Sequence, residues 1–273
     1  MPDYSNILIA TDLDGTLYEN QNNIPRENLD AIRYFTENGG HFAIATGRGI
    51  EAARVVAEKL PTKTPSIVNN GHTLFGFTND KFIANKSLPD TAKITLSKIL
   101  DKYNVAAEIY SGKDLYVINP NKALIDHLTY EKVNYNNTCI SDIFELKWNK
   151  VLITDQKKDI DIVRKELENQ TFDGFDFVDT SSIYVEMVIK GITKGTALCD
   201  LAEYLNIPLQ NTYSIGNFYN DIGLLQSAAH SAVVKDTPKD VAIYADYICE
   251  RTADGGAVAE YIQKIIGNDN LIN

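Results

Sequence analysis

An apolar run near the N-terminus that ends in two carboxylates and a glycine constrains the fold of this chain most. Ile7-Leu8-Ile9-Ala10 is followed by Thr11-Asp12-Leu13-Asp14-Gly15. A short apolar run without polar alternation is typical of a strand covered on both faces, as in a parallel sheet. Open parallel sheets bind ligands beyond the carboxyl ends of their strands. The sequence therefore predicts that Asp12 and Asp14 lie at a ligand-binding edge.

Asp12 and Asp14 carry like charges two residues apart, which restricts what can surround them. Such carboxylates repel one another unless a cation, a proton or hydrogen bonds separate their states. A magnesium ion is one solution, because Mg2+ prefers oxygen ligands and is commonly bound by one or two carboxylates together with substrate phosphate oxygens. Taken alone, the pattern is also compatible with a plain turn or a calcium-like loop.

The composition describes an acidic globular protein. The 273 residues are 44% hydrophobic and 23% charged, which suits one large domain or two moderate ones. With 26 Lys and Arg against 37 Asp and Glu, the formal charge is −11, and the sequence holds no basic tract. We therefore expect no nucleic acid partner, because the phosphate backbone requires clustered positive charge. An anionic substrate would need positive charge supplied locally.

Signals for export or membrane insertion are lacking in the sequence. No stretch approaches the roughly 18 apolar residues of a membrane span, and Met1-Pro2-Asp3-Tyr4 does not open a signal peptide. We expect a cytoplasmic protein with no membrane partner. Cys139, Cys199 and Cys249 are widely separated, so neither a disulfide framework nor a zinc site is indicated.

The pattern along the first part of the chain alternates strands and helices. A helix is expected over about residues 25–38, a buried strand over 41–45 and a second helix over 50–60, which together form a parallel βαβ unit. Ser66-Ile67-Val68 is expected to be a third strand of the same sheet.

A different pattern begins at Gly71. Residues 73–77 and 81–84 suggest a hairpin, and a mixed α+β block follows. In that block we expect helices over 90–103, 122–133 and 159–170 and strands over 105–110, 115–119, 151–154, 175–178 and 183–188. The parallel pattern then resumes, with helices expected over 195–205, 221–228 and 257–266 and strands over 213–215, 232–234 and 247–248.

The sequence therefore predicts an α/β fold with a doubly wound, mainly parallel, Rossmann-like core sheet and an inserted α+β domain. The expected boundaries are residues 1–83 and 189–273 for the core and 84–188 for the insertion.

Three further loops share features that suit phosphate binding. They are Thr46-Gly47-Arg48, Lys194-Gly195 and Gly216-Asn217-Phe218-Tyr219-Asn220-Asp221. A hydroxyl followed by glycine lets the side chain and the backbone N–H approach one phosphate oxygen, and a lysine before a helix adds positive charge. Each loop alone is equally typical of an ordinary turn or helix start.

Taken together, the four segments resemble motifs one to four of the haloacid dehalogenase (HAD) superfamily. These are Asp12-x-Asp14-x-Thr16, Thr46-Gly47-Arg48, Lys194-Gly195 and Gly216-x-x-x-Asn220-Asp221. The insertion between the second and third motifs is similar to the type IIB cap of the Cof-like sugar-phosphate phosphatases. Three other sites also resemble that subgroup, namely Asn69-Asn70-Gly71, Glu186 and Asp254-Gly255-Gly256.

The resemblance implies a Mg2+-dependent phosphatase of small phosphorylated metabolites such as sugar phosphates. Asp12 would attack phosphorus and become an aspartyl-phosphate, while Asp14 would serve as general acid and then general base. The remaining implied roles are phosphate binding by Thr46, Gly47, Lys194 and Asn220, and metal binding by Asp12, the backbone carbonyl of Asp14, Asn217 and Asp221.

One residue departs from the family pattern. The position after the motif-four glycine is typically a metal-binding aspartate in the family, and here it is Asn217. An amide oxygen binds Mg2+ without contributing charge, so Asp221 would have to compensate. Asn217 therefore leaves open a phosphometabolite-binding or regulatory protein with weakened catalysis. The resemblance also leaves open a phosphomutase of the same superfamily, because phosphomannomutases share the type IIB cap.

Overall fold

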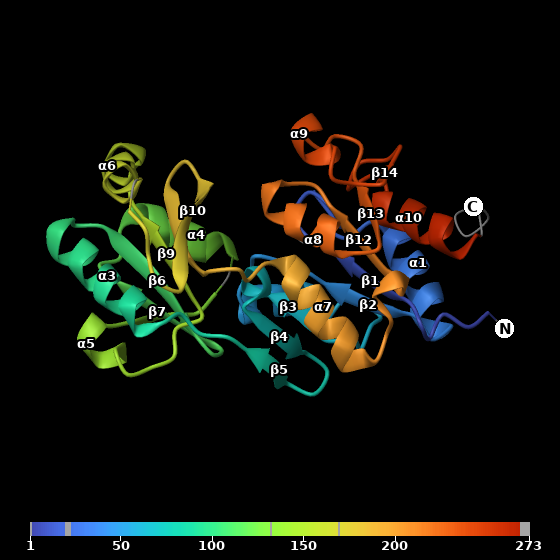
Figure 1. Cartoon of the computed structure of the whole chain (residues 1–273), viewed down its shortest axis with the longest axis horizontal. Coiled ribbons are helices and arrows are strands. Elements are labelled where there is room, and N and C mark those ends of the chain that lie inside the picture. The colour runs from blue at the N-terminus through green and yellow to red at the C-terminus, as the bar shows by residue number, and fades with distance from the viewer. Residues whose placement is uncertain (1, 20–22, 132, 169, 268–273) are drawn as a thin grey trace. The chain divides into compact units, whose positions relative to one another are not determined.

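The computed structural model describes residues 2–19, 23–131, 133–168 and 170–267. Its contacts divide the chain into two compact units (Figure 1). The core unit comprises residues 1–84 and 192–273, and the inserted unit comprises residues 85–191.

A five-stranded parallel sheet forms the centre of the core unit, in the order β14-β13-β12-β1-β2. The strands are β1 (Leu8–Thr11), β2 (His41–Ile44), β12 (Thr212–Gly216), β13 (His230–Val233) and β14 (Tyr247–Ile248). All of β1 is buried. The prediction of a central strand covered on both faces is therefore confirmed for the run that precedes Asp12.

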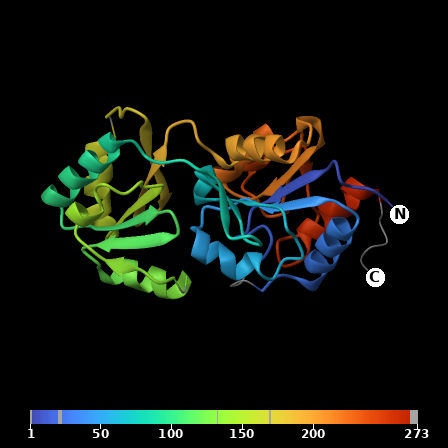
Figure 2. The ribbon, with the colours of Figure 1, turned by 90° about the horizontal axis from the view of Figure 1, so that it is seen from below.

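Helices cover both faces of this sheet, as Figure 2 shows. The helices of the core unit are α1 (Arg26–Glu37), α2 (Ile50–Ala57), α7 (Lys194–Leu205), α8 (Ile222–Ser227), α9 (Lys239–Ala242) and α10 (Ala257–Ile266). Phe35 of α1 and Ile262 of α10 share one hydrophobic cluster with Ile9. Leu201 of α7 and Leu8 belong to another. Successive residues of β1 thus face opposite layers, and the doubly wound fold class is confirmed.

The third predicted strand does not join the parallel sheet. β3 (Ser66–Val68) belongs to a separate sheet in the order β3-β4-β5, with β4 (Thr73–Gly76) antiparallel to β3 and β5 (Lys81–Asn85) beside β4. An isolated parallel bridge joins Ile67 of β3 to Ala45, the residue that follows β2. Asn69 and Asn70 both have positive φ, so the chain reverses directly after β3 and pairs with itself.

The inserted unit is built on a six-stranded sheet in the order β10-β11-β9-β6-β7-β8. Its strands are β6 (Ala106–Ser111), β7 (Asp114–Ile118), β8 (Asn136–Asn137), β9 (Lys150–Thr154), β10 (Phe175–Ser181) and β11 (Tyr184–Ile189). Its helices are α3 (Asp90–Lys102), α4 (Lys122–Glu131), α5 (Ile140–Ile143) and α6 (Lys157–Leu167). The sequence analysis did not predict β8 and α5, because elements this short show no hydrophobic periodicity.

Two hydrophobic clusters stabilise the inserted unit. One contains side chains of α3, α5 and α6 together with the buried Trp148. The other contains Leu124 and Leu128 of α4 with Leu152 of β9. Because both clusters are made of inserted-unit residues alone, this unit has a core of its own.

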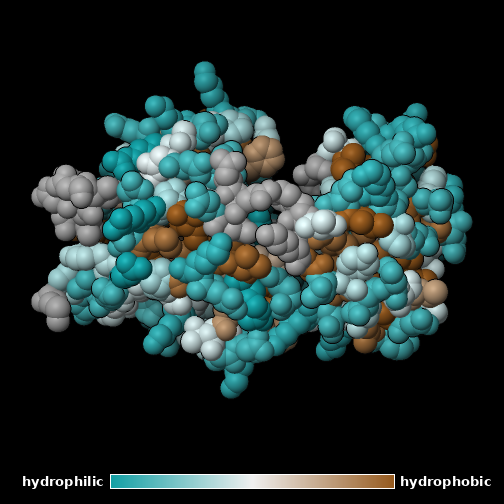
Figure 3. Space-filling model, turned by 180° about the vertical axis from the view of Figure 1, so that it is seen from behind, coloured by the Kyte–Doolittle hydropathy of each residue, from teal (hydrophilic) through white to brown (hydrophobic). Residues whose placement is uncertain are grey.

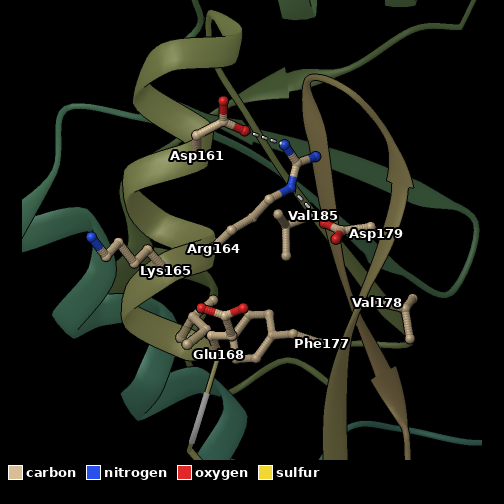
Figure 4. A pocket seen from close by; sticks show the side chains of 9 residues that line it. Asp161, Arg164, Lys165, Glu168, Phe177, Val178, Asp179 and Val185 are labelled. Carbon is tan, nitrogen blue, oxygen red and sulfur yellow. Dashed lines mark hydrogen bonds and ion pairs between the residues drawn. The ribbon is translucent and has the colours of Figure 1, made fainter.

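A hollow of about 450 Å3 lies between α6 and the β10–β11 hairpin (Figure 4). Arg164 spans it, with its guanidinium bonded to Asp161 and Asp179 and to the carbonyl oxygens of Ser182 and Tyr184. These bonds fasten the helix to the hairpin.

The surface is mostly hydrophilic. Figure 3 shows one face of the molecule, where hydrophobic residues lie in small groups among hydrophilic ones. Within the residues that the structure describes, no helix is long and apolar enough to cross a membrane.

A close contact between α7 and α8 fixes the start of α7. An added Cβ at Gly195 would lie 2.0 Å from the carbonyl oxygen of Gly223 and 2.4 Å from the Ser227 hydroxyl. The first distance involves backbone, which cannot turn away as a side chain can.

We expect Gly195→Ala to destabilise the protein by about 1–3 kcal/mol, because overpacking forces backbone to move. Urea unfolding should show the loss. Glu203→Ala is the matched control, since Glu203 lies exposed on the same helix and should change the free energy of unfolding by less than about 0.5 kcal/mol. Equal stability of the two variants would contradict the packing argument.

Candidate active site

Apart from Lys194, which begins α7, the predicted site residues lie at the carboxyl ends of β1, β2 and β12. Thr11 pairs with Ile44 on one side and with Ile215 on the other. The N–H of Asp12 extends this ladder by donating to the carbonyl of Ile215 at 3.0 Å. The three loops that follow these strands therefore begin side by side at one edge of the sheet.

Lys194 connects the first loop with the loop after β12. Its ammonium Nζ lies 2.6 Å from Asp12 Oδ1 and 2.7 Å from Asp221 Oδ1. The side chains of Lys194 and Asp221 are 0% exposed, and that of Asp12 is 8% exposed. Thr193, the N-cap of α7, accepts from the N–H of Thr196 and fixes the helix start that carries Lys194.

The charges of this cluster shift its ionisation. Burial is the largest effect on Asp12 and, with the neighbouring Asp221, raises the pKa of Asp12 above its usual range, although Lys194 opposes this. Burial alone would lower the pKa of Lys194, but Asp12 and Asp221 outweigh it, so the pKa of Lys194 is raised. The two carboxylates therefore favour the charged form of Lys194, and added positive charge beside Asp12 would favour the ionised form of Asp12.

Asp221 uses both carboxylate oxygens. Oδ1 accepts from Lys194, and Oδ2 accepts from the backbone N–H groups of Asn217 and Phe218, at 2.9 and 3.1 Å. An added Cβ on Gly216 would lie 2.7 Å from the side chain of Asp221. Asp221 thus shapes the loop after β12 and holds Lys194 in place.

Asp14 is paired with the loop after β2. Arg48 donates from Nε to Asp14 Oδ2 at 2.8 Å and from the terminal Nη2 to Asp14 Oδ1 at 2.7 Å. The guanidinium carbon lies 5.9 Å from the ring centroid of the buried Tyr18. Burial first, and then the charges of Asp14 and Asp12, raise the pKa of Tyr18, against the opposite effect of Arg48.

Thr46, Gly47 and Asn220 come together around Asn70. Thr46 is buried, and its hydroxyl accepts from the N–H of Arg48. An added Cβ on Gly47 would lie 2.9 Å from Asn70 Oδ1, and Asn220 Nδ2 donates to the same oxygen at 3.4 Å. The sequence analysis named the Asn69-Asn70-Gly71 run as a point of resemblance but assigned Asn70 no role in the site. Its signal was the Asn-Asn-Gly run, which favours positive φ.

Asn217 lies against the first loop. Its Oδ1 accepts from the Thr16 hydroxyl at 3.2 Å. Gly15 has φ +76°, and an added Cβ there would lie 2.3 Å from Asn217 Nδ2. The side-chain amide of Asn217 thus packs against the loop that contains Asp14, and the missing side chain of Gly15 leaves room for its Nδ2.

The chain belongs to the haloacid dehalogenase-like hydrolases, because residues 9–262 match the sequence model of that family. It is therefore a hydrolase. The 5-amino-6-(5-phospho-D-ribitylamino)uracil phosphatase YitU of Bacillus subtilis is 26% identical over 230 residues, which cover 81% of this chain and 83% of that protein.

Solved structures share the fold. A haloacid dehalogenase-like hydrolase from Bacteroides thetaiotaomicron superposes with a TM-score of 0.86 at 23% identity, covering 95% of this chain and 99% of that one. The HAD subclass IIB sugar phosphatase BT4131 superposes with a TM-score of 0.80 at 19% identity, covering 97% and 100%. Both similarities extend over the core and inserted units.

We expect Asp221→Asn to cost about 3 kcal/mol of stability, because it removes one of the two carboxylates that compensate the buried charge of Lys194. Thermal or urea unfolding would measure it. Asp240→Asn is the matched control: Asp240 is exposed and accepts from the Tyr219 hydroxyl, and its loss should cost less than about 1 kcal/mol. A similar small cost for both substitutions would contradict the buried ion-pair account.

Proposed function

We propose that this protein is a Mg2+-dependent phosphatase that hydrolyses phosphate monoesters of small polyhydroxylated metabolites through an aspartyl-phosphate. The observation that carries the proposal is the buried Asp12 carboxylate beside Lys194 at the end of β1. Burial raises the pKa of Asp12. The neighbouring cation works against that effect, favours the ionised form that a nucleophile needs and attracts a phosphoryl group.

The reaction would proceed in two balanced steps. The Asp12 oxygen forms a bond to phosphorus as the bond to the substrate oxygen breaks, and Asp14 gives its proton to the departing alkoxide. Water then attacks the phosphorus of the aspartyl-phosphate while Asp14 takes up the proton of that water. Asp12 leaves as a carboxylate, inorganic phosphate is released, and both side chains return to their starting states.

Donors from three loops would hold the transferring phosphoryl group. Thr46 and the Gly47 N–H would bind from the loop after β2, Lys194 from the start of α7, and the Asn220 amide from the loop after β12. Fixed donors and cations of this kind stabilise the charge spread over the equatorial phosphoryl oxygens. Asn70, which contacts Asn220, would orient that amide.

The donor chemistry near Asp12 fits a magnesium ion. Asp12, the Asp14 backbone carbonyl and Asn217 would supply oxygen ligands, and Asn217 Oδ1 lies within the first loop, where it accepts from Thr16. When bound, Mg2+ would neutralise phosphoryl charge. Both carboxylate oxygens of Asp221 already accept hydrogen bonds. Asp221 would therefore contribute negative charge near the magnesium ion without coordinating it directly.

Two related proteins support the substrate class. YitU acts on a phosphorylated ribityl compound by its name, and the subclass IIB neighbour is a sugar phosphatase. Both names describe phosphate esters of hydroxyl-rich small molecules, and we extend that class to this protein.

We expect Asp12→Asn to reduce phosphate release by at least about 10³-fold, because an amide cannot form the acyl-phosphate. The measurement is turnover of p-nitrophenyl phosphate and a sugar-phosphate panel with and without Mg2+. The exposed Asp240→Asn variant should retain full turnover. Undiminished activity of a folded Asp12→Asn protein would rule out the mechanism.

A second candidate is a phosphometabolite-binding protein with weak turnover, and Asn217 is the observation that favours it. Its amide brings no charge where the family carries a carboxylate. Calorimetry that shows ligand binding while phosphate release stays at background would select this function.

Asn217→Asp distinguishes the two candidates. We expect the added carboxylate to lower the Mg2+ concentration needed for half-maximal activity by about tenfold, because ligand charge sets affinity for hard cations. Asn220→Asp makes the same change at a proposed phosphate-binding residue, so it should raise KM and leave the Mg2+ requirement unchanged. An Mg2+ requirement that stays the same in Asn217→Asp would exclude residue 217 from the metal site.

A further inference from the structure

Arg48 and Asp14 form a two-point ion pair that the proposed reaction must open. Each carboxylate oxygen of Asp14 accepts one guanidinium N–H, at 2.8 and 2.7 Å. This parallel geometry is the strong form of an arginine–carboxylate pair. Asp14 can reach a leaving-group oxygen only if at least one of these bonds is released.

The backbone of Arg48 is fixed next to the proposed phosphate site. Its N–H donates to the hydroxyl of Thr46 at 3.1 Å, and its carbonyl oxygen accepts from the N–H of Asn69 at 2.9 Å. A change of partner must therefore occur by rotation of the side chain alone. A phosphoryl group bound by Thr46 and Gly47 would lie against the loop from which that side chain starts.

The charges of the site also favour such an exchange. Three carboxylates, Asp12, Asp14 and Asp221, surround two cations, Lys194 and Arg48. With all three carboxylates ionised their sum is −1 before a metal ion is counted, and a phosphate dianion would add negative charge. A guanidinium presents several N–H groups that match phosphate oxygens in a bidentate way.

Burial separates the two cations by how easily they can move. Lys194 is 0% exposed and held by two nearly buried carboxylates, so removing it would leave charge in a dry site. The Arg48 side chain is itself 11% exposed, but its partner Asp14 is 55% exposed, so water can replace the guanidinium at that carboxylate. Of the two cations, Arg48 is therefore the one whose carboxylate partner is accessible to water.

We propose that Arg48 exchanges between Asp14 and the phosphoryl oxygens of the substrate. In the free protein Asp14 holds Arg48. Phosphate binding transfers the guanidinium to the phosphoryl group, and Asp14, released from the guanidinium, takes up from water the proton that its general-acid role requires and turns to the leaving-group oxygen. The inference rests on the proposed phosphatase function and adds a substrate-binding role for Arg48. It also makes Asp14 a competitor that weakens phosphate binding, since only the fraction of molecules with Arg48 free binds at full strength.

A double-mutant cycle read by phosphate binding tests the exchange. Calorimetry with inorganic phosphate at fixed Mg2+ is run on the full-length wild type, Asp14→Asn, Arg48→Gln and the double variant. Removing the Asp14 charge favours an anion in every background. Only in proteins that keep Arg48 does it also free a guanidinium, so the two effects separate.

We expect Asp14→Asn to tighten phosphate binding by about fivefold more when Arg48 is present than when it is replaced by glutamine. Arg48→Gln alone should weaken phosphate binding. Arg48→Lys, which keeps the charge without the fork, should give an intermediate affinity and serves as the second variant if Arg48→Gln unfolds.

Equal tightening in both backgrounds would overturn the exchange and leave the phosphatase proposal intact. Unchanged phosphate affinity in Arg48→Gln and Arg48→Lys would overturn it as well. Failure of all four proteins to bind phosphate, with no turnover by the wild type, would instead overturn the proposed function and the exchange together.

Discussion

A single buried ammonium, that of Lys194, holds this site together. It contacts two carboxylates that come from positions 182 and 27 residues away in the chain, Asp12 and Asp221. Burying any one of the three charges without an oppositely charged partner would cost a large desolvation free energy. The end of β1, the start of α7 and the loop after β12 must therefore reach their places together, and the ionic cluster is satisfied only in the finished core.

The main elements of the fold could be predicted from the sequence because their side chains report burial directly. The unbroken apolar run of β1 and the helical periods of α1 and α10 depend on which faces are covered. The pairing of β3 could not be predicted in this way. Its residues suit a parallel neighbour as well as an antiparallel one, and the choice depends on the turn made by Asn69 and Asn70.

The candidate site could also be predicted only in part from the sequence. The residue types and spacing of the four motif loops indicated which side chains carry chemistry, and their roles remain proposals. How those side chains pair is a different matter. Asp221 accepts hydrogen bonds from Lys194 and from its own loop, and Asn70 accepts one from Asn220. The pairs Asp221–Lys194 and Asn70–Asn220 join segments that are distant in the sequence. No local pattern encodes such contacts.

The inserted unit has its own hydrophobic clusters, and the chain passes between the two units at just two points, after Ala84 and after Gly191. At the second point Gly191 has φ +75° and no neighbouring atom within 4 Å of where a Cβ would stand. Residues 85–191 can therefore be substituted, or replaced by another segment that joins the same two ends, without a change in the sheet that carries Asp12. The inserted unit can therefore vary in sequence while the core unit, which carries Asp12, keeps its fold.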